Sequence, residues 1–168
     1  MNNSKQPDSA YAFFSLGSNL GDREGNLKEA QRLMEVQMGR IERMSMVYES
    51  SPWGFASDHP FCNMCLLIRT VLTPPDLMKK ALQVEKEMGR VSEKGGYADR
   101  IIDVDLLLFD DLVLDLPGLV LPHPKMEMRK FVMVPLSEIA PDHIHPVSGL
   151  TMAEILGRCQ DPSEITPV

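Results

Sequence analysis

The amino-acid sequence predicts an α+β sandwich in which helices cover a mixed or antiparallel β-sheet. Segments with the alternation of a β-strand and segments with the apolar repeat of a helix follow one another in the order β-α-β-β-α-β, before a C-terminal extension. Two consecutive strands are joined without a helix, which favours antiparallel neighbours in the sheet. This order of elements is that of a ferredoxin-like fold and differs from that of a Rossmann fold.

The first part of the chain has the pattern of a strand, a helix and another strand. Residues 11–16 are predicted to form a strand that ends at the glycine-flanked segment 17–21. Asp22 is a candidate N-cap for the helix that follows. Residues 40–49 alternate as a strand does, and the segment 50–54 interrupts them. The apolar face of the predicted helix is formed by Leu27, Ala30, Met34 and Met38.

The segment 61–72 is a predicted strand whose two faces differ in character. Phe61 and Asn63 lie on one face, because side chains two residues apart in a strand point the same way. The other face is apolar and consists of Cys62, Met64, Leu66 and Ile68. Cys62 and Cys65 therefore point to opposite faces, and we interpret them as buried structural residues rather than as a metal or redox pair.

The proline pair at residues 74–75 ends that strand, and a second helix is predicted after Asp76, up to Gly89. Its apolar positions recur at helical spacing and are Leu77, Ala81, Val84 and Met88. The polar, glycine-containing segment 90–99 is predicted to be a mobile loop. The next strand is predicted at residues 100–109, with a buried side formed by Ile102, Val104, Leu106 and Leu108.

The rest of the chain contains shorter elements. Short pieces of structure are predicted around Val113 and at residues 119–121, and helices at residues 131–139 and 152–156. No repeat or break in composition divides the chain. We expect a single domain at residues 11–160, preceded by a flexible segment at residues 1–10 and followed by a tail at residues 161–168.

The 168 residues carry a formal net charge of −7, and the pI is near 5.1. An acidic chain without runs of lysine and arginine is a poor candidate for binding nucleic acid or an anionic membrane. A signal peptide is not expected, and no apolar stretch approaches the roughly 18 residues that cross a bilayer. Three cysteines form no disulfide framework. We therefore expect a cytoplasmic protein.

Asp103 and Asp105 are the candidates for a metal site. They lie two residues apart in a predicted strand, so their side chains project from one face, about 6–7 Å apart at the backbone. Adjacent carboxylates repel each other unless a cation lies between them. Mg²⁺ prefers oxygen ligands and shares its coordination shell with substrate phosphates. The alternative is a solvent-facing polar stripe on an edge strand.

Cationic or titratable residues accompany this acidic pair in the sequence. They are Arg90, Arg100, His123 and Arg129. A guanidinium group binds phosphate oxygens through two parallel hydrogen bonds. The usual phosphate loops are missing, since residues 17–21 lack the Gly-Lys-Ser/Thr ending of a P-loop and no Gly-x-Gly-x-x-Gly occurs. We expect side chains and metal, rather than a glycine-rich loop, to hold any nucleotide.

Several pieces of the sequence occur in an order that is similar to a known family. They are Gly17-Ser-Asn-Leu-Gly21, then Phe61-Cys-Asn63, then Gly89-Arg90 with Arg100-Ile-Ile-Asp103-Val-Asp105, then Leu121-Pro-His123-Pro-Lys-Met126-x-x-Arg129-x-Phe131. Over roughly residues 11–156 the chain resembles the 6-hydroxymethyl-7,8-dihydropterin pyrophosphokinases of folate biosynthesis.

The resemblance implies a monomeric, Mg-ATP-dependent enzyme of ferredoxin-like fold. It would move the pyrophosphoryl group of ATP to the hydroxymethyl oxygen of the pterin and release AMP. Asp103 and Asp105 would hold two Mg²⁺ ions and act in catalysis with Arg90 and Arg100. The residues in contact with ATP would be Glu85, Arg90, Arg100, Leu106, His123 and Arg129. Those in contact with the pterin would be Ser50, Ser51, Trp53, Phe61, Asn63, Tyr97 and Phe131.

Some positions depart from the commonest pattern of this family. Tyr97 stands where tryptophan is frequent, and Asp99 replaces the usual proline before Arg100. Ser92 occupies a position that is often basic. The positions of Pro124 and Gly118 also differ, since an aromatic and a basic residue respectively are usual there. We therefore expect the contacts of the loop at residues 90–99 to differ from the usual ones.

Two rival functions belong to other classes. An ordinary kinase or a nucleotidyltransferase could use the same Asp-x-Asp pair, and a ferredoxin-like module could bind a small molecule without catalysis. The nucleotide product separates the enzymes, since a kinase leaves ADP and a nucleotidyltransferase releases pyrophosphate. Clustered carboxylates argue against the binding module, because such a module gains little from uncompensated charge.

Overall fold

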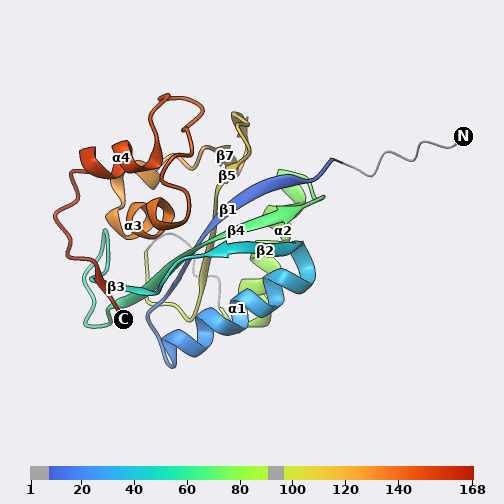
Figure 1. Ribbon diagram of the computed structural model, residues 1–168. Helices are drawn as coiled ribbons and strands as arrows, with labels where there is room; N and C mark the ends of the chain where they lie inside the picture. The colour runs from blue at the N-terminus through green and yellow to red at the C-terminus, as the bar shows by residue number, and fades with distance from the viewer. Residues whose placement is uncertain (1–7, 91–96) are drawn as a thin grey trace, which may run out of the picture.

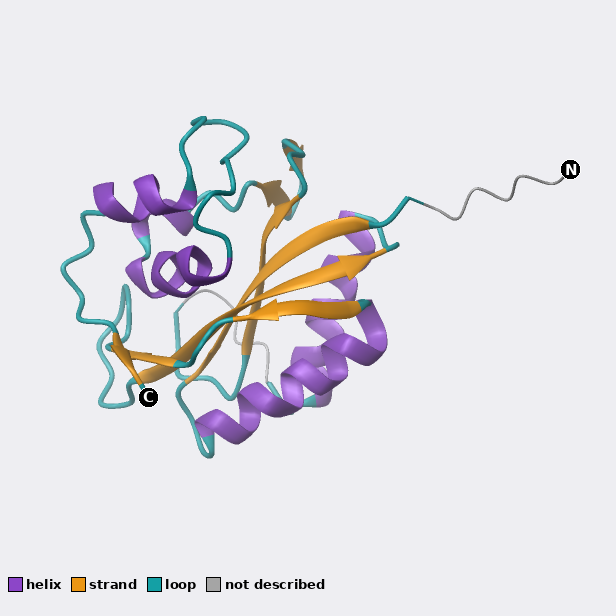
Figure 2. Ribbon diagram, viewed as in Figure 1, coloured by secondary structure: helices purple, strands orange, loops and turns teal. Residues whose placement is uncertain are grey.

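The structure is a computed structural model that describes residues 8–90 and 97–168. Within these residues the main sheet has six strands in the order β5-β1-β4-β3-β8, with β2 also pairing with β4. Neighbouring strands in it are antiparallel. Helices lie against both faces of this sheet (Figures 1 and 2). The predicted α+β sandwich of ferredoxin-like type is confirmed.

The sheet has three long strands and three shorter ones. The three long strands are β1 (Ala10–Ser18), β4 (Phe61–Thr70) and β5 (Asp103–Phe109), of which β5 lies at one edge of the sheet. The shorter strands are β2 (Arg40–Met44), β3 (Tyr48–Ser50) and β8 (Thr166–Pro167). A separate hairpin consists of β6 (Leu114–Leu116) and β7 (Leu119–Leu121), at the short pieces predicted from the sequence.

Helices α1 (Arg23–Met38) and α2 (Pro74–Glu87) cover one face of the sheet. The Asp22 side chain caps α1 by accepting a hydrogen bond from the Gly25 N–H, as predicted. Thr73 caps α2 in the same way, and Pro74 occupies its first turn, where no backbone donor is needed. The apolar residues predicted for the inner face of α1 are all buried against Phe14, Leu16 and the even-numbered side of β4.

Helices α3 (Lys130–Ile139) and α4 (Met152–Arg158) cover the opposite face, together with the short 3-10 helix η1 (Met126–Met128). Phe13 and Cys65 lie in this second core. Cys62 lies in the first one. The predicted separation of the two cysteines onto opposite faces is therefore confirmed. No helix in the two described ranges is long and apolar enough to span a membrane.

The segment predicted as one strand at residues 40–49 is divided in two. Ser45 separates β2 from β3 and is buried, with its hydroxyl accepting a hydrogen bond from the Cys65 N–H. Its own N–H donates to the Cys65 carbonyl. The serine side chain thus replaces a bond of the sheet ladder and allows the chain to turn between the two strands.

The strand predicted at residues 100–109 begins at Asp103 instead. The N–H and C=O of Arg100 are bonded to Asn19 and so do not join the sheet. A bulge also shifts the register, because Phe14 pairs with Leu106 whereas Phe13 pairs with Leu108. Leu108 is consequently buried in the α3–α4 core, and its predicted place beside Leu106 was wrong.

Residues 1–7 and 91–96, which include Ser92 and most of the segment predicted to be mobile, lie outside the described residues. Within the segment predicted as a C-terminal tail, β8 pairs with β3 at the edge of the sheet. The C-terminus therefore lies beside β3 (Figure 1).

Candidate functional site

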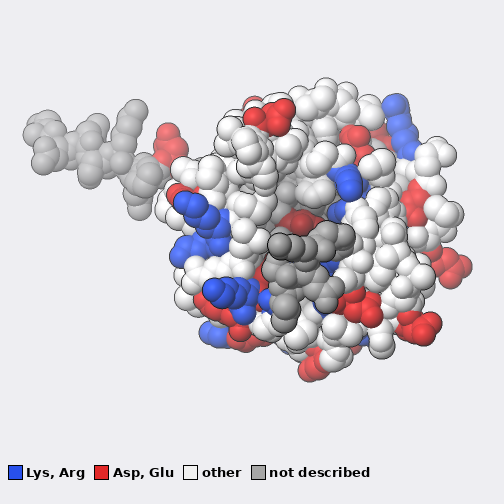
Figure 3. Space-filling view, turned by 180° about the vertical axis from the view of Figure 1, so that it is seen from behind, with Lys and Arg blue, Asp and Glu red and all other residues white. Residues whose placement is uncertain are grey.

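A cleft of about 490 Å³ lies where β1 ends and where β4 and β5 begin. Gly17 pairs with both Asn63 and Asp103, which brings these three strand ends side by side. Alternation along the strands directs Asn63 and Asp103 to the α3–α4 face. Seen from behind, the molecule is hollowed near its centre, with acidic and basic side chains close together there (Figure 3).

The acidic part of the cleft combines β5 with α2. Asp103 and Asp105 both line the cleft, whereas the side chain of Val104 between them packs in the α1–α2 core, which confirms that the two aspartates project from one face of their strand. Glu85 from α2 is buried, and its Oε1 accepts a hydrogen bond from the Val104 N–H at 2.9 Å. Burial raises the pKa of Glu85, and the nearby Asp103 charge acts in the same direction. These carboxylates concentrate negative charge at the start of β5.

Asp105 is the more perturbed member of the aspartate pair. Loss of contact with water, followed by the like charge of Asp103, raises the pKa of the Asp105 carboxyl to about 7. The nearest cation is Arg129, whose Nη1 lies 3.8 Å from Asp105 Oδ2. A divalent cation held between Asp103 and Asp105 would relieve this repulsion, so the donor set fits Mg²⁺ with phosphate oxygens completing its shell.

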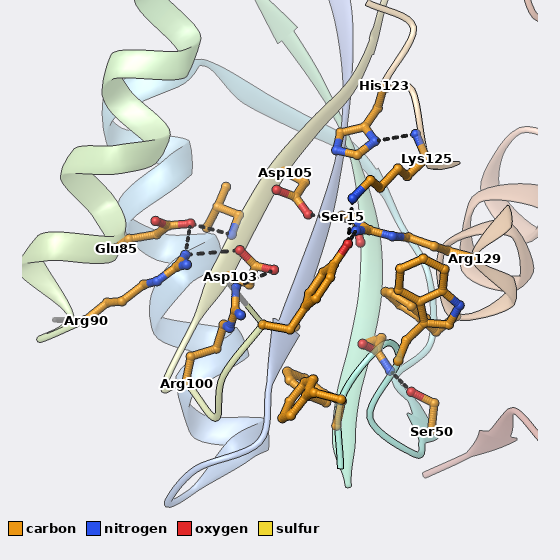
Figure 4. A pocket seen from close by; sticks show the side chains of 18 of the residues that line it. Ser15, Ser50, Glu85, Arg90, Arg100, Asp103, Asp105, His123, Lys125 and Arg129 are labelled. Carbon is orange, nitrogen blue, oxygen red and sulfur yellow. Dashed lines mark hydrogen bonds and ion pairs between the residues drawn. The ribbon is translucent and has the colours of Figure 1, made fainter. Parts of the chain in front are cut away.

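Arg90 and Arg100 form ion pairs with Asp103 (Figure 4). Arg90 Nη1 lies 2.7 Å from Glu85 Oε1 and 3.1 Å from Asp103 Oδ1. Arg100 Nη1 lies 3.4 Å from Asp103 Oδ2, and its Nε donates to the Ala98 carbonyl. Both guanidinium groups therefore stand beside the predicted metal site, where they can also reach the phosphates of a nucleotide.

The opposite wall comes from the segment between β7 and α3, with His123, Lys125 and Arg129 (Figure 4). The Lys125 N–H donates to His123 Nδ1, so the imidazole carries its proton on Nε2. Burial, followed by the charge of Arg129, lowers the pKa of His123 to about 4. His123 is thus a neutral hydrogen-bond donor at pH 7.

An aromatic slot adjoins the charged region. Asn63 is buried, and its Nδ2 donates to Ser50 Oγ at 2.8 Å. The lining rings are Trp53, Phe55, Phe61, Tyr97 and Phe131. A side chain at Gly17 would lie 3.3 Å from Asn63 Oδ1, so glycine at this position leaves room for the slot. The slot offers flat apolar walls and an amide, which suits a planar heterocycle.

The chain is similar in sequence to a known family of proteins. The family model described as 7,8-dihydro-6-hydroxymethylpterin-pyrophosphokinase (HPPK) matches residues 13–141. A 2-amino-4-hydroxy-6-hydroxymethyldihydropteridine pyrophosphokinase of Porphyromonas gingivalis is 43% identical over 140 residues, which are 82% of this chain and 95% of that protein. The Aquifex aeolicus protein of the same name is 42% identical over 82% of this chain and 85% of its own length.

The chain belongs to this pyrophosphokinase family. A folic acid synthesis protein of Dictyostelium discoideum is also similar, with 37% identity over 90% of this chain and 23% of that protein. Among solved structures, wild-type Plasmodium falciparum HPPK-DHPS with pterin and p-hydroxybenzoate superposes with a TM-score of 0.73 at 16% identity. The match covers 92% of this chain and 42% of that one, so the chain spans less than half of the solved protein, and the likeness shows the shared fold.

The cleft of this family member brings together most residues predicted for its site. The predicted residues that line the cleft are Ser50, Ser51, Trp53, Phe61, Asn63, Glu85, Arg90, Tyr97, Arg100, Asp103, Asp105, His123, Arg129 and Phe131. Leu106 does not line it, although the resemblance placed it at the nucleotide. Its side chain is buried in the core between the sheet and helices α1 and α2, because it follows the same alternation as Val104.

The cleft also contains residues that sequence reasoning missed. They are Ser15, Gly17, Phe55, Met78, Leu82, Val104 and Lys125. Ser15 and Gly17 share one face of β1, and alternation along that strand was the available signal. Lys125 lies two residues after His123 in the family motif, yet a single lysine in an irregular segment has no periodic pattern that marks it.

Proposed function

We propose that this chain transfers the pyrophosphoryl group of ATP to the hydroxymethyl oxygen of 6-hydroxymethyl-7,8-dihydropterin and releases AMP, as a step of folate biosynthesis. Membership of the pyrophosphokinase family supports the reaction. The observation that carries the proposal is one cleft that joins a carboxylate pair, a ring of cations and an aromatic slot with a buried amide. A kinase of another substrate class would not need that slot.

Asp103 and Asp105 would hold two Mg²⁺ ions, which when bound supply charge neutralisation and a lower pKa for the attacking hydroxyl. Arg90 and Arg100 reach Asp103 from one side of the cleft, and Arg129 reaches Asp105 from the other. Phosphate oxygens of ATP between these walls would bind the arginines and the Nε2–H of His123. Enzymes catalyse phosphoryl transfer mainly by positioning the substrates and compensating their charge in this way.

The pterin would occupy the aromatic slot, between Phe61 and Phe131. Asn63 would hydrogen-bond the edge of the heterocycle with its amide, which Ser50 already holds in place. Ser51, Trp53 and Tyr97 would close the remaining side. In this arrangement the hydroxymethyl group would point toward the carboxylate pair, because Asn63 and Asp103 flank the same residue of β1.

The proposal extends to the domain bounds, the oligomeric state and the cellular compartment. We infer that the catalytic domain is residues 11–160, with β8 added at the edge of its sheet, and that it acts as a monomer, as the resemblance to the family implies. A reducing compartment such as the cytoplasm suits the chain, because Cys62 and Cys65 are buried free thiols. Burial raises the pKa of Cys65 above its ordinary range, so this thiol is unreactive.

The nucleotide product tests the proposed function. The chain is incubated with ATP, Mg²⁺ and the reduced hydroxymethyl pterin, and the nucleotides are separated by chromatography. AMP should form in equal amount to pterin diphosphate, and only when the pterin is present. Formation of ADP would indicate an ordinary kinase, and release of free pyrophosphate would indicate a nucleotidyltransferase. An unchanged ATP pool at all pterin concentrations would favour a non-catalytic binding module.

A further inference from the structure

Lys125 reaches into the cleft from the wall that also carries His123 and Arg129 (Figure 4). Its Nζ lies 2.7 Å from the Tyr97 hydroxyl and 5.2 Å from the centre of that ring. Arg129 Nη2 lies 3.3 Å from the same hydroxyl oxygen. Two cationic groups therefore converge on one neutral oxygen, and they lower the pKa of Tyr97.

The charges in the cleft are not matched evenly. Arg90 and Arg100 face carboxylates of Glu85 and Asp103, and Arg129 faces Asp105. Within residues 8–90 and 97–168, no carboxylate lies within ion-pair distance of Lys125. The remaining charge on this wall is therefore positive, and it faces the open cleft.

Arg129 adds an unused donor to this wall. The residue is 8% exposed, and its Nε is buried without a hydrogen-bond partner among the described residues. A buried donor without a partner is costly, so such atoms commonly mark the place of a ligand or water. Anionic oxygens would satisfy both the Arg129 donor and the Lys125 charge, as charge-assisted hydrogen bonds do.

We propose that Lys125 and Arg129 form a subsite for the pyrophosphoryl end of ATP, and that the Tyr97 hydroxyl occupies the position that a phosphate oxygen takes when ATP binds. The inference rests on the proposed function and adds Lys125 to its binding residues. In this role Lys125 binds the part of the nucleotide that is transferred and makes no contact with the adenosine. Tyr97 competes with ATP for the two cations.

Nucleotide binding without turnover tests this subsite. Lys125→Met keeps the length of the side chain and removes its charge, and Lys125→Arg keeps the charge. The ligands are α,β-methylene-ATP, in which the bond that must break is blocked, and AMP, both with Mg²⁺. Calorimetry should show that Lys125→Met binds the ATP analogue about tenfold to a hundredfold more weakly, the scale for one charge-assisted hydrogen bond. The affinity of Lys125→Met for AMP should stay within about twofold of the wild-type value.

The controls separate a local effect from a general one. Lys28→Met removes an exposed lysine from α1, which contributes nothing to the cleft, and should bind both nucleotides as the wild type does. Lys125→Arg should retain most of the affinity for the analogue. Tyr97→Phe should bind the analogue about twofold to fivefold more tightly, because no hydroxyl remains to compete.

Three results would overturn the inference. One is wild-type affinity of Lys125→Met for the analogue, and another is an equal loss of affinity for the analogue and for AMP. Weaker binding by Tyr97→Phe would show that its hydroxyl supports the nucleotide instead of competing with it. The proposed function fails separately, by the absence of AMP formation in the wild type, and these binding measurements do not depend on turnover.

Discussion

At Asp103 two guanidinium groups meet a single carboxylate, and both come from the ends of the segment that joins α2 to β5. Arg90 is shared between Asp103 and Glu85, whereas Arg100 bonds Asp103 alone among the acidic side chains described. The side chain of Arg100 is 12% exposed, so its charge is poorly screened by water. Arg100 is therefore placed to follow charge that builds up on a transferring phosphoryl group.

Substitution of Arg100 tests this role. Arg100→Ala should lower kcat by roughly 10²–10³, the usual scale for one electrostatic stabiliser, with a smaller effect on ATP affinity. Arg100→Lys should recover only part of the lost kcat, because an ammonium group cannot bind phosphate oxygens through two parallel hydrogen bonds. Rapid-quench kinetics with ATP binding measured separately will distinguish the two effects. A loss of affinity with an unchanged chemical step would make Arg100 an anchoring residue only.

His123 should make the free energy of unfolding depend on pH. Its pKa is lowered from 6.5 to about 4 in the folded protein. Between pH 4 and 6.5 the unfolded chain therefore binds more protons, and the free energy of unfolding falls as the pH falls through this window. The contribution is on the order of 1–3 kcal/mol.

Urea denaturation of the wild type and of His123→Gln, each at pH 7.0, 5.5 and 4.5, measures this contribution. Groups far from the cleft titrate equally in both proteins, so the difference between them reports on His123 and the charges beside it, such as Asp103. The wild type should lose more stability than the variant between pH 7.0 and 4.5. Parallel curves for the two proteins would mean that the imidazole titrates normally in the folded state.

The place of a single residue was predictable where it belongs to a regular sequence pattern. Asp103 and Asp105 were found because strand alternation places residues two apart on one face. Lys125 was missed, since its place in the cleft depends on how the segment after β7 folds over the sheet. For Leu106 the two kinds of reasoning differ, because the resemblance placed it at the nucleotide whereas strand alternation directed its side chain to the core, where the structure has it.

At the scale of elements, the turn between β1 and α1 anchors the segment that precedes β5. Asn19 is buried, and its Nδ2 donates to the His59 carbonyl at 3.1 Å and to Asp99 Oδ1 at 2.7 Å. Its Oδ1 accepts the N–H of Arg100, and its own N–H donates to the Arg100 carbonyl. Asn19 is thus a positioning residue that fixes the backbone of Arg100.

A charge exchange between Asn19 and Asp99 tests this anchor. Asn19→Asp should lower kcat by about tenfold to a hundredfold, because two carboxylates then face each other where a hydrogen bond stood. The double variant Asn19→Asp with Asp99→Asn restores a donor and an acceptor, and should recover most of the loss. Asp99→Asn alone is the matched control. A double variant as impaired as Asn19→Asp would show that the bond does not position Arg100.

The pterin slot depends on two elements that meet across the cleft. Asn63 comes from β4 and Phe131 from the first turn of α3. Asn63→Ala and Phe131→Ala should each weaken pterin binding, and the lost hydrogen bond plus the lost ring stacking amount to on the order of 2–4 kcal/mol. ATP binding should change far less. Titration calorimetry with each ligand checks this, and equal losses for both ligands would indicate a general disturbance of the fold.

Element types were more predictable than their ends. Helices α1 and α2 follow from caps and apolar repeats that lie in the local sequence. The division at Ser45 and the bulge in β5 depend on hydrogen bonds to distant strands. Such tertiary bonds leave no periodic trace in the segment itself, so one strand was predicted where two occur and Leu108 was placed on the wrong face.

At the scale of the whole molecule, the antiparallel sheet explains why the cleft forms where it does. β1 runs between β4 and β5, so the end of one strand meets the starts of two others, at Gly17. Side chains as far apart in the sequence as those of Ser15 and Phe131 thereby reach one cavity. The order of elements predicted this sheet, but the closeness of residues 123–131 to Asp105 depends on packing against α3 and α4.

The most direct measurement follows the phosphorus atoms of ATP. The wild type, Asp103→Asn and Asp105→Asn are each given ATP labelled at the α- or the β-phosphorus, with Mg²⁺ and the reduced hydroxymethyl pterin. In the wild type the β label should pass to the pterin and the α label should remain in AMP. Both variants should stay folded and transfer the β label at least about 10³-fold more slowly, since each loses a carboxylate of the proposed metal site. Wild-type transfer rates in both variants, or α label on the pterin, would contradict the account.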